Sequence, residues 1–456
     1  SRYQRTLVSV RWQGQPDFYD RVSICHTHQT IIEIFSGFVW SLLNTFMQKN
    51  KNLLTDKQFQ ILRHTNIDTW RTQDWIAEQG LHPKDVFTIE GLKRLRPFTK
   101  RDIQQAGKNF ASTNVPNAYL PIGHVESSGS TGQPVSLNKT SVNNLFWSAH
   151  TFRDHIWHKR DFNTKLAAIR ANFNDTELRQ NWGAPVAQLY KTGTGLGLPV
   201  NWTTRQQLEG LEMFQPNILV VHGGVLGSLM TIWEREGCKL TELQHIKQIG
   251  DTVHDSLRER VKKMFGFKIE DNYSSSEVGT IAIQCPESGL YHIMAENLIV
   301  EILDKDNNDC KPGEIGRVVV TDLHNLASPV IRYDLGDYAE VGSECTCGRH
   351  LPTLKRIIGR ERGMFKKADG SQFWPRGGYR GIKTFEVRQF QMIQHAVDDI
   401  EYRMVTDNPL TPEQEQEAIA SIESVFDMPG TVRIVRYENE IPLKNGKYEE
   451  SICLIK

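Results

Sequence analysis

Apolar and polar positions alternate in two different ways along the middle of the chain. Residues 218–221 form a short apolar run, which predicts a buried β-strand. His222, Gly223 and Gly224 then turn the chain into an apolar helix that we expect to end near Glu236. A strand followed directly by a helix is the first half of a βαβ unit.

The next segment repeats this order. Leu257, Val261 and Phe265 recur every four residues, which predicts a helix with one apolar face. Gly266 stands where a helix-ending glycine is expected, and residues 267–269 predict another strand. Strands separated by helices over this part of the chain predict a mainly parallel sheet.

Beyond about residue 283 the helical pattern disappears. Residues 298–303 and 317–321 are β-like runs joined by a polar, turn-rich link, which predicts an antiparallel sheet or a small barrel. The N-terminal part is different again, because residues 53–67 and 70–78 carry helical patterns.

The C-terminal part has a strand–helix–strand order of its own. Residues 401–405 and 431–437 predict strands. Between them, Thr411 is a candidate N-cap and Pro412 fits the first position of a helix with one apolar face. A segment of this kind predicts a small α+β domain.

These patterns together predict an α/β fold. A large N-terminal domain, residues 1–359, is expected to hold βαβ sheets plus a small antiparallel β subdomain. A small α+β C-terminal domain, residues 360–456, is expected to be a mobile lid on it.

Composition narrows the possible partners. Among the 456 residues, Lys and Arg total 54 and Asp and Glu total 54, so the formal net charge is zero. That balance argues against nucleic acid or an anionic membrane as partner. We found no apolar stretch long enough to span a membrane and no signal peptide. Seven cysteines at irregular spacing favour a reducing, cytoplasmic location.

A run of small residues before Gln133 is the strongest local signal for chemistry. Small residues and hydroxyls leave the backbone free to wrap an anion and supply hydrogen-bond donors to phosphate oxygens. No Lys stands where a Walker loop requires one. A plain flexible loop is the alternative. The run consists of Ser127, Ser128, Gly129, Ser130, Thr131 and Gly132.

A second signal, residues 271–277, follows the predicted strand at 267–269. In open α/β sheets, ligands bind at the carboxyl ends of the strands. The ring of Tyr273 can stack on a flat base, and the carboxylate of Glu277 can hold Mg²⁺. The alternative is a polar loop with a capping serine.

Two further motifs are weak when taken singly. Residues 331–337 contain Arg332 and two acids, which could form an ordinary surface salt-bridge cluster. Residues 444–447 could be a turn with two solvated lysines.

The order of the four motifs resembles that of the acyl-adenylate-forming superfamily, the AMP-dependent synthetases and ligases. Its phosphate loop resembles residues 127–134, and its Tyr-Gly-x-Thr/Ser-Glu motif resembles residues 273–277. Its Arg-Tyr-x-Thr-Gly-Asp motif resembles residues 332–337, and its C-terminal lysine motif resembles residues 445–447. The short length and the Cys-Thr-Cys-Gly-Arg run at residues 345–349 resemble the phenylacetate-CoA ligase branch and its CapK-like relatives.

The resemblance implies ATP-dependent activation of a carboxylic acid as an acyl-adenylate, with release of pyrophosphate and transfer to CoA. Alternatives are an adenylation enzyme that delivers to a carrier protein or an amine, and a nucleotide-binding protein without catalysis. The implied catalytic residues are Lys447, between carboxylate and α-phosphate, and Glu277, on Mg²⁺. The implied nucleotide-binding residues are Ser127, Ser128, Gly129, Ser130, Thr131, Gly132, Gly250, Asp251, Tyr273, Ser276, Asp337 and Arg360.

Two positions depart from the family pattern. Gln133 stands in the phosphate loop where many members have Lys. Gly359 and Arg360 resemble the hinge region of the family, and Arg362 stands two positions after this arginine, where members usually have an acid or Lys. Because of the second departure, the sequence does not decide whether the C-terminal domain rotates as in other members.

A separate set of residues predicts a structural zinc site. Two cysteines one residue apart can share a metal ion, and two further ligands upstream would complete a closed site. Free cytoplasmic cysteines are the alternative. The four candidate ligands are Cys285, His292, Cys345 and Cys347.

The glycine-rich run at residues 193–197 lacks the spacing of a dinucleotide fingerprint. We predict a mobile loop there, near the acyl pocket. His222, which follows a predicted strand, could shape the same pocket.

Overall fold

The computed structural model describes most of the chain beyond residue 74. The described residues are 75–82, 85, 89–126, 134–250, 253, 255–375, 385, 387, 389–406, 408–428, 430–438, 441 and 449–455.

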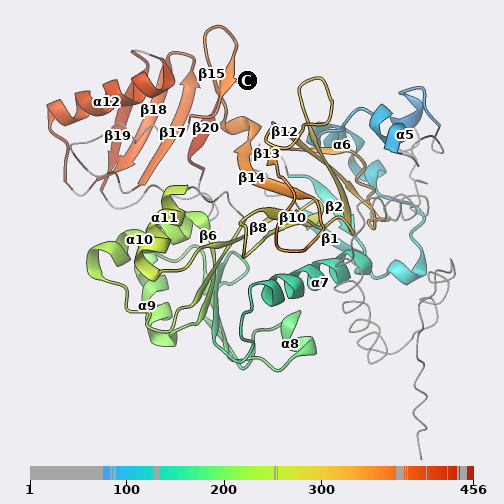
Figure 1. Ribbon diagram of the computed structural model, residues 1–456, viewed down its shortest axis with the longest axis horizontal. Helices are drawn as coiled ribbons and strands as arrows, with labels where there is room; N and C mark the ends of the chain where they lie inside the picture. The colour runs from blue at the N-terminus through green and yellow to red at the C-terminus, as the bar shows by residue number, and fades with distance from the viewer. Residues whose placement is uncertain are drawn as a thin grey trace, which may run out of the picture.

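A single twelve-stranded sheet forms the centre of the described structure (Figure 1). Its order is β11-β12-β13-β14-β10-β9-β8-β7-β6-β3-β5-β4. The strands are β3 (Leu166–Arg170), β4 (Glu177–Arg179), β5 (Gly195–Pro199), β6 (Ile218–His222), β7 (His245–Ile249), β8 (Glu270–Ser275), β9 (Gly279–Gln284), β10 (Tyr291–Ile293), β11 (Leu298–Leu303), β12 (Ile315–Asp322), β13 (Tyr333–Val341) and β14 (Thr353–Arg360).

The sheet changes character at β8. Neighbouring strands from β5 through β3, β6 and β7 to β8 are parallel, because helices connect them. From β8 through β14 to β11 the pairs are antiparallel. The predicted antiparallel part therefore exists, and it continues the parallel sheet through the β8–β9 pair.

Helices cover both faces of the parallel half. Alternate residues along each strand face opposite sides, so the strands contribute to two apolar clusters. One cluster packs on α9 (Thr204–Phe214), α10 (Gly223–Glu236) and α11 (Asp255–Phe265). The other packs on α7 (Ser141–Trp157) and α8 (Val186–Leu189). A buried sheet of this kind needs apolar side chains on both faces.

The C-terminal residues form a second sheet with its own core (Figure 1, orange to red). Its order is β19-β18-β17-β20, and α12 packs on one face. The elements are β17 (Gln389–Ala396), β18 (Asp399–Val405), α12 (Pro412–Phe426), β19 (Val432–Tyr437) and β20 (Ser451–Cys453). The Thr411 hydroxyl accepts a hydrogen bond from the Gln414 amide, as the N-cap prediction requires.

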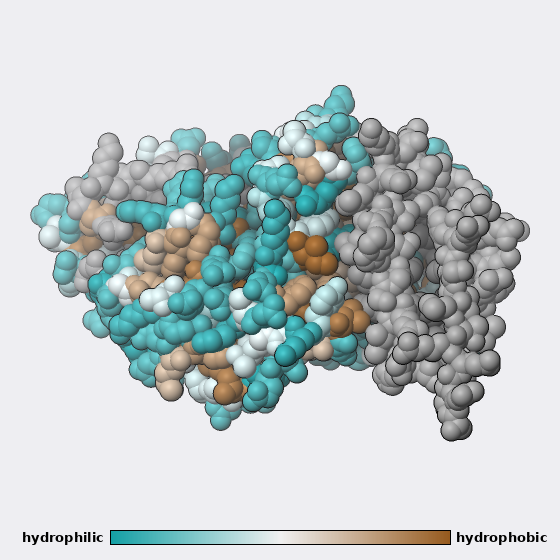
Figure 2. Space-filling view, turned by 60° about the horizontal axis from the view of Figure 1, so that its bottom comes forward, coloured by the Kyte–Doolittle hydropathy of each residue, from teal (hydrophilic) through white to brown (hydrophobic). Residues whose placement is uncertain are grey.

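Shorter elements complete the described structure. They are α5 (Ile89–Arg94), α6 (Lys100–Ala106), η3 (Gly107–Phe110), η4 (Asn117–Tyr119), β1 (Gly123–Glu126), β2 (Ser136–Lys139), η5 (Glu361–Gly363), β15 (Phe365–Lys366) and β16 (Gln372–Phe373). Among the described residues, we find no helix with both the length and the apolar character of a membrane span. Apolar side chains on the face shown in Figure 2 lie in small groups among hydrophilic ones.

The predicted α/β class with a mixed sheet is confirmed, and several elements match their predicted limits. The helix predicted to end near Glu236 is α10, and residues 298–303 are β11. The strand predicted at residues 267–269 begins later, at Glu270. The predicted helix at 53–67 and most of that at 70–78 lie outside the described residues, and the division at residue 359 stays a prediction.

The prediction of a mobile loop at residues 193–197 was wrong. Gly195 to Gly197 belong to the buried strand β5. A Cβ on Gly197 would lie 2.4 Å from the ring of Phe173, so the absent side chain lets the ring pack on the backbone. Glycines here serve close packing within the sheet.

Arg332 joins the N-terminal segment to the antiparallel half of the sheet. The residue is 1% exposed, and its Nε and Nη2 donate to the two carboxylate oxygens of Glu301, each at 3.0 Å. Nη1 donates to the carbonyl of Lys93 at 2.8 Å and to that of Leu95. The alternative of a surface salt-bridge cluster is therefore wrong for this arginine.

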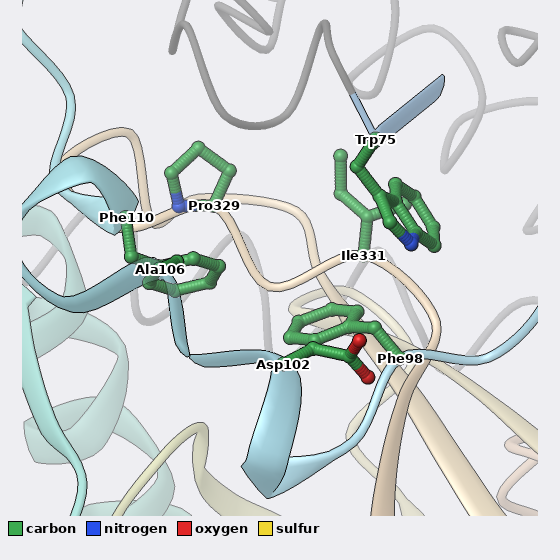
Figure 3. Close-up of a pocket in the computed structure, with 7 residues that line it drawn as sticks. All are labelled: Trp75, Phe98, Asp102, Ala106, Phe110, Pro329 and Ile331. Carbon is green, nitrogen blue, oxygen red and sulfur yellow. The ribbon is translucent and has the colours of Figure 1, made fainter. Parts of the chain in front are cut away.

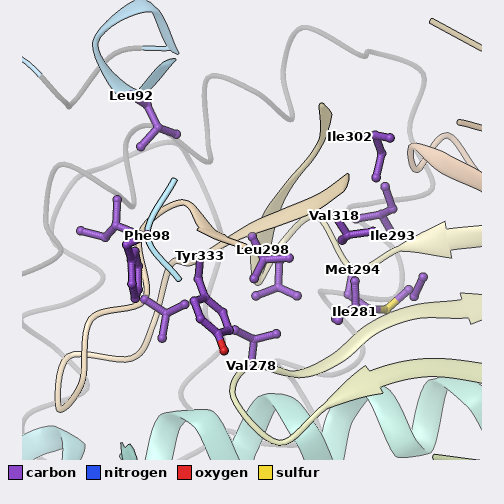
Figure 4. Packing of buried hydrophobic residues seen from close by; sticks show 14 of the residues in the cluster. Leu92, Phe98, Val278, Ile281, Ile293, Met294, Leu298, Ile302, Val318 and Tyr333 are labelled. Atoms are coloured by element: carbon purple, nitrogen blue, oxygen red, sulfur yellow. The ribbon is translucent and has the colours of Figure 1, made fainter. Parts of the chain in front are cut away.

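Phe98, three residues after Leu95, pairs with β13 through its backbone and packs on it through its ring. The Phe98 amide donates to the Arg332 carbonyl at 3.0 Å, and the Asp334 amide donates to the Phe98 carbonyl at 2.8 Å. The ring of Phe98 packs on Tyr333 with centroids 5.2 Å apart (Figure 4). The segment before α6 is thereby fixed against β13.

A small pocket lies on the other side of Phe98 (Figure 3). Its lining is apolar except for Asp102, which accepts from the Thr99 amide at 2.7 Å as part of the α6 capping box. It lacks the convergent polar groups of a catalytic site. The lining residues are Trp75, Phe98, Asp102, Ala106, Phe110, Pro329 and Ile331.

We predict that Arg332→Met lowers the free energy of unfolding by about 3–5 kcal/mol, because it leaves the buried Glu301 carboxylate without its partner. Denaturant titration followed by circular dichroism measures the change. Arg205→Met is the matched control, because Arg205 pairs with Glu236 on the surface. Equal effects of the two substitutions would contradict the role given to Arg332.

Candidate active site

Tyr273, Asp337 and Arg360 meet where β8, β13 and β14 lie close together. The Tyr273 hydroxyl donates to Asp337 Oδ2 at 2.8 Å, and Arg360 Nε lies 3.4 Å from Asp337 Oδ1. Asp337 and Arg360 are paired residues of β13 and β14. Burial raises the pKa of Asp337, while Arg360 and the Tyr273 hydroxyl favour its charged form. The contacts hold this carboxylate in a fixed place beside a cation.

Glu277 lies next to this group, in the turn between β8 and β9. The Tyr333 hydroxyl donates to Glu277 Oε1 at 3.4 Å. Lys139 Nζ contacts the Glu277 carbonyl and lies 3.7 Å from Asp322. Two motifs separated by about sixty residues, 273–277 and 332–337, therefore share direct contacts through Tyr273 and Tyr333.

Lys100 is a residue of this site that the sequence did not reveal. Pairing of Phe98 with β13 places Lys100, the first residue of α6, within the electrostatic reach of Glu277. Burial lowers the pKa of Lys100; Glu277 opposes this, while Arg360 and Arg362 add to it. The signal available in the sequence was the Phe-Thr-Lys run at residues 98–100, which by itself indicates only the start of a helix.

Gly250 lies at the carboxyl end of β7, beside His222 at the end of β6. Its φ of +78° is in the region that favours glycine, and a Cβ would lie 2.8 Å from two atoms of the His222 ring. The turn after β7 is thus shaped by a glycine and packed by an imidazole. Ser276, in the β8–β9 turn, is exposed.

The remaining predicted nucleotide and catalytic residues lie outside the described part of the chain. These are Ser127, Ser128, Gly129, Ser130, Thr131, Gly132, Asp251 and Lys447. Strands β1 and β2, on either side of the first six, pair with each other. That pairing ends at Lys139, which contacts Glu277.

Arg362, in the predicted hinge, forms an ion pair with Glu449, two positions after Lys447. The Arg362 guanidinium is also close enough to Arg360 and Asp337 to influence them electrostatically. Burial lowers the pKa of Arg362, and Glu449 opposes that change. A third cation therefore stands beside Lys100 and Arg360.

The four predicted metal ligands are brought together by β9, β10 and the loop between β13 and β14. Their ligand atoms all lie within 4.8 Å of one another. The Cys285 and Cys345 sulfurs are 3.8 Å apart, and Cys347 Sγ is 3.3 Å from His292 Nε2. Tetrahedral Zn²⁺ with Zn–S of about 2.3 Å requires about 3.8 Å between sulfurs, so this geometry fits zinc.

The same cluster is packed against α7. The Trp157 ring lies edge-on to His292 with centroids 5.5 Å apart, and Arg349 lies 4.7 Å over the Trp157 ring. His292 is fully buried, and burial lowers its pKa to about 4. The cluster therefore packs the antiparallel half of the sheet against the last residue of α7.

The chain is similar in sequence to several known proteins that share one activity. No family model matches the chain. The chain is 25% identical over 304 residues to a phenylacetate-coenzyme A ligase of Thermus thermophilus, covering 63% of this chain and 65% of that protein. It is also 25% identical over 356 residues to a phenylacetate-coenzyme A ligase of Pseudomonas putida, covering 71% and 74%. The match thus spans just under two thirds of the Thermus relative.

A solved structure shares the fold. The structure of 2-hydroxyisobutyryl-CoA ligase in the postadenylation state, in complex with R3-HIB-AMP, matches with a TM-score of 0.70 and 16% identity, covering 88% of each chain. At this identity the likeness shows the fold alone. Together with the sequence matches, it confirms the predicted resemblance to adenylate-forming ligases of the phenylacetate-CoA ligase branch.

Proposed function

We propose that the protein activates a carboxylic acid with ATP, forming an acyl-adenylate and pyrophosphate, and then transfers the acyl group to CoA. The observation that carries this is the meeting of Tyr273, Glu277, Asp337 and Arg360 in one place, in a chain similar to phenylacetate-CoA ligases. The similarity to CoA ligases is also the support for CoA as acceptor.

Charge is the main obstacle to this reaction. The attacking carboxylate and the α-phosphate are both anionic, so the site must offset negative charge and hold the two groups in line. Lys100, Arg360 and Arg362 supply positive charge around Glu277 and Asp337. We propose Lys447 as the further cation that lies between the carboxylate and the α-phosphate.

The other roles follow the family assignment. Asp337, held by Tyr273 and Arg360, is suited to accept from ribose hydroxyls, and the Tyr273 ring to border adenine together with the Gly250–Asp251 turn. Glu277 would hold Mg²⁺, which would screen the phosphate charges. Its carboxylate is only partly buried, and Tyr333 contacts one of its oxygens. Ser127 to Gly132, with Ser276, would donate to phosphate oxygens.

We predict ATP–pyrophosphate exchange with at least one member of a carboxylic acid panel. Lys447→Ala should lower kcat by about 10²- to 10³-fold, the usual effect of removing one group that stabilises transition-state charge. Lys444→Ala, in the same segment, is the control. Full activity of Lys447→Ala would remove the role given to this lysine.

The same assay separates the alternatives. Tight ATP binding with no exchange on any acid would favour a nucleotide-binding protein without catalysis. Incubation with CoA, a carrier protein or an amine, followed by mass spectrometry, identifies the acceptor. A product formed only with a carrier protein or an amine would contradict CoA transfer.

We predict that Lys100→Gln lowers kcat/KM for exchange by about 10- to 100-fold, because a cation near Glu277 and the phosphates is lost. Arg101→Gln, at the exposed next position of α6, should leave exchange unchanged. Steady-state kinetics with saturating acid measures both. Equal activity of the two variants would place Lys100 outside the site.

We also propose that Cys285, His292, Cys345 and Cys347 hold a structural zinc ion. Metal analysis of the purified protein should give about one Zn²⁺ per chain. Cys345→Ser should lose the metal and lower the melting temperature, because closed zinc sites contribute to folding. Cys238→Ser is the control, since Cys238 lies outside the cluster. A folded, metal-free preparation would overturn the proposal.

A further inference from the structure

We propose that the acid substrate carries a second anionic group, such as a second carboxylate, which pairs with Arg170 at the carboxyl end of β3. This inference rests on the proposed function and names the class of acid that the site selects. Its grounds are the position of Arg170, the charges around it and its distance from the candidate active site.

Arg170 is the last residue of β3, at the sheet edge where parallel α/β proteins bind ligands. Ala168 pairs with Val220 on β6, and both belong to the apolar cluster under α7 and α8. Since side chains alternate along a strand, Arg170 and His222, two residues further on, face the same side. His222 packs against Gly250 of the proposed adenine turn. Arg170 thus lies on the same face of the sheet as His222, whose ring contacts this turn.

The described residues offer Arg170 no counter-ion. Its Nε is shielded from solvent without a hydrogen bond, and its side chain forms no ion pair in the described structure. The charged groups below it are already balanced. Arg160 Nη1 and Lys247 Nζ lie 2.6 and 2.5 Å from Asp154 Oδ2, and Arg160 also contacts Glu270. The two carboxylates, of Asp154 and Glu270, balance the two cations, Arg160 and Lys247. Arg170 is therefore an additional positive charge.

Histidines occupy the remaining positions around the same carboxylates. His158 Nδ1 lies 3.2 Å from Asp154 Oδ1, and His245 Nδ1 lies 2.6 Å from Glu270 Oε1. Arg170 also lies near enough to Lys247 to lower the pKa of that lysine, after the larger effects of burial, Asp154 and Arg160. Asp154 and Glu270, the carboxylates of this cluster, therefore already have cationic and imidazole partners.

Arg170 is half-buried and its Nε is shielded without a hydrogen bond, so a ligand anion that accepts from Nε supplies a contact that the described residues do not. Burial lowers the pKa of Arg170, yet a guanidinium stays protonated in proteins. Its planar fork matches a carboxylate through two parallel hydrogen bonds. A second carboxylate of the substrate is the group that this arrangement fits.

The spacing leaves room for an acyl chain. The sheet order from β8 through β7 and β6 to β3 comprises three strand spacings, or about 14 Å at about 4.8 Å each. The reacting carboxylate would lie at the carboxyl end of β8, and the second anion at the carboxyl end of β3. An acid of extended shape with an anionic group at each end would span the two positions.

The test compares matched pairs of straight-chain acids of increasing length in pyrophosphate exchange. Each pair has one monocarboxylic acid and the α,ω-dicarboxylic acid of equal length. For the best-fitting pair, the unaltered protein should prefer the diacid by at least about 30-fold in kcat/KM, as expected when a buried charge would otherwise stay unpaired. Arg170→Gln should remove this preference, mainly through a higher KM for the diacid.

Two further variants control the result. Arg170→Lys keeps the charge but loses the two parallel bonds, so it should retain part of the preference. Arg205→Gln, a surface arginine paired with Glu236, should retain all of it. If Arg170→Gln does not fold, the acid pairs on the unaltered protein and on Arg170→Lys decide the question.

The failures are distinguishable. No exchange with any acid would overturn the proposed function itself. Exchange with equal kcat/KM for both members of every pair, or equal effects of Arg170→Gln on both members, would overturn the role of Arg170 and leave the activation of acids standing.

Discussion

The buried ion pair of Arg332 with Glu301 is the constraint on which the candidate site depends. The Arg332 guanidinium also donates to the carbonyls of Lys93 and Leu95. One side chain therefore connects the end of α5 and the segment before α6 to the antiparallel sheet. Phe98 then pairs with β13, and Lys100 begins α6 near Glu277. Several partners offset the cost of burying this charge, and the same contacts set the position of a second charge, that of Lys100.

The charged side chains of the candidate site are also concentrated in a small region. The chain as a whole has no net charge, yet Lys100, Arg360 and Arg362 gather around two carboxylates, Glu277 and Asp337. Long-range steering of an anionic substrate by net charge is therefore weak, and binding has to come from groups within a few ångströms. In such a site the positions of individual side chains matter more than the composition of the surface, which is why hydrogen bonds such as that from Tyr273 to Asp337 are informative.

Local patterns predicted local structure well, and the resemblance predicted which motifs would meet. The β6–α10 unit and α11 follow from periodicity within a dozen residues, and the Cys/His cluster at Cys285, His292, Cys345 and Cys347 follows from the chemistry and spacing of its residues. Lys100 and Arg332 could not be placed in this way, because Lys100 lies near Glu277 and Arg332 binds the carbonyls of Lys93 and Leu95, all more than a hundred residues away. A single sequence does not show such pairing. The error at residues 193–197 has a different cause: glycine predicts flexibility when considered alone, and the ring of Phe173 that packs on it is visible only in the fold.

Arg362, which departs from the family pattern at the predicted hinge, would change the energetics of a rotation of the C-terminal domain. Arg362 and Arg360 repel each other, and Glu449 offsets this repulsion through its ion pair with Arg362. Glu449 belongs to the C-terminal unit, because its carbonyl accepts from Gln391 of β17 at 2.9 Å. Asp337 and Arg360, in contrast, belong to the large sheet. A rotation about the hinge that separated these two units would have to break the Arg362–Glu449 pair or carry Arg362 away from Asp337. Either change would remove a charge from the neighbourhood of the proposed nucleotide site, so the predicted rotation of the C-terminal domain would alter the electrostatics of that site through one arginine.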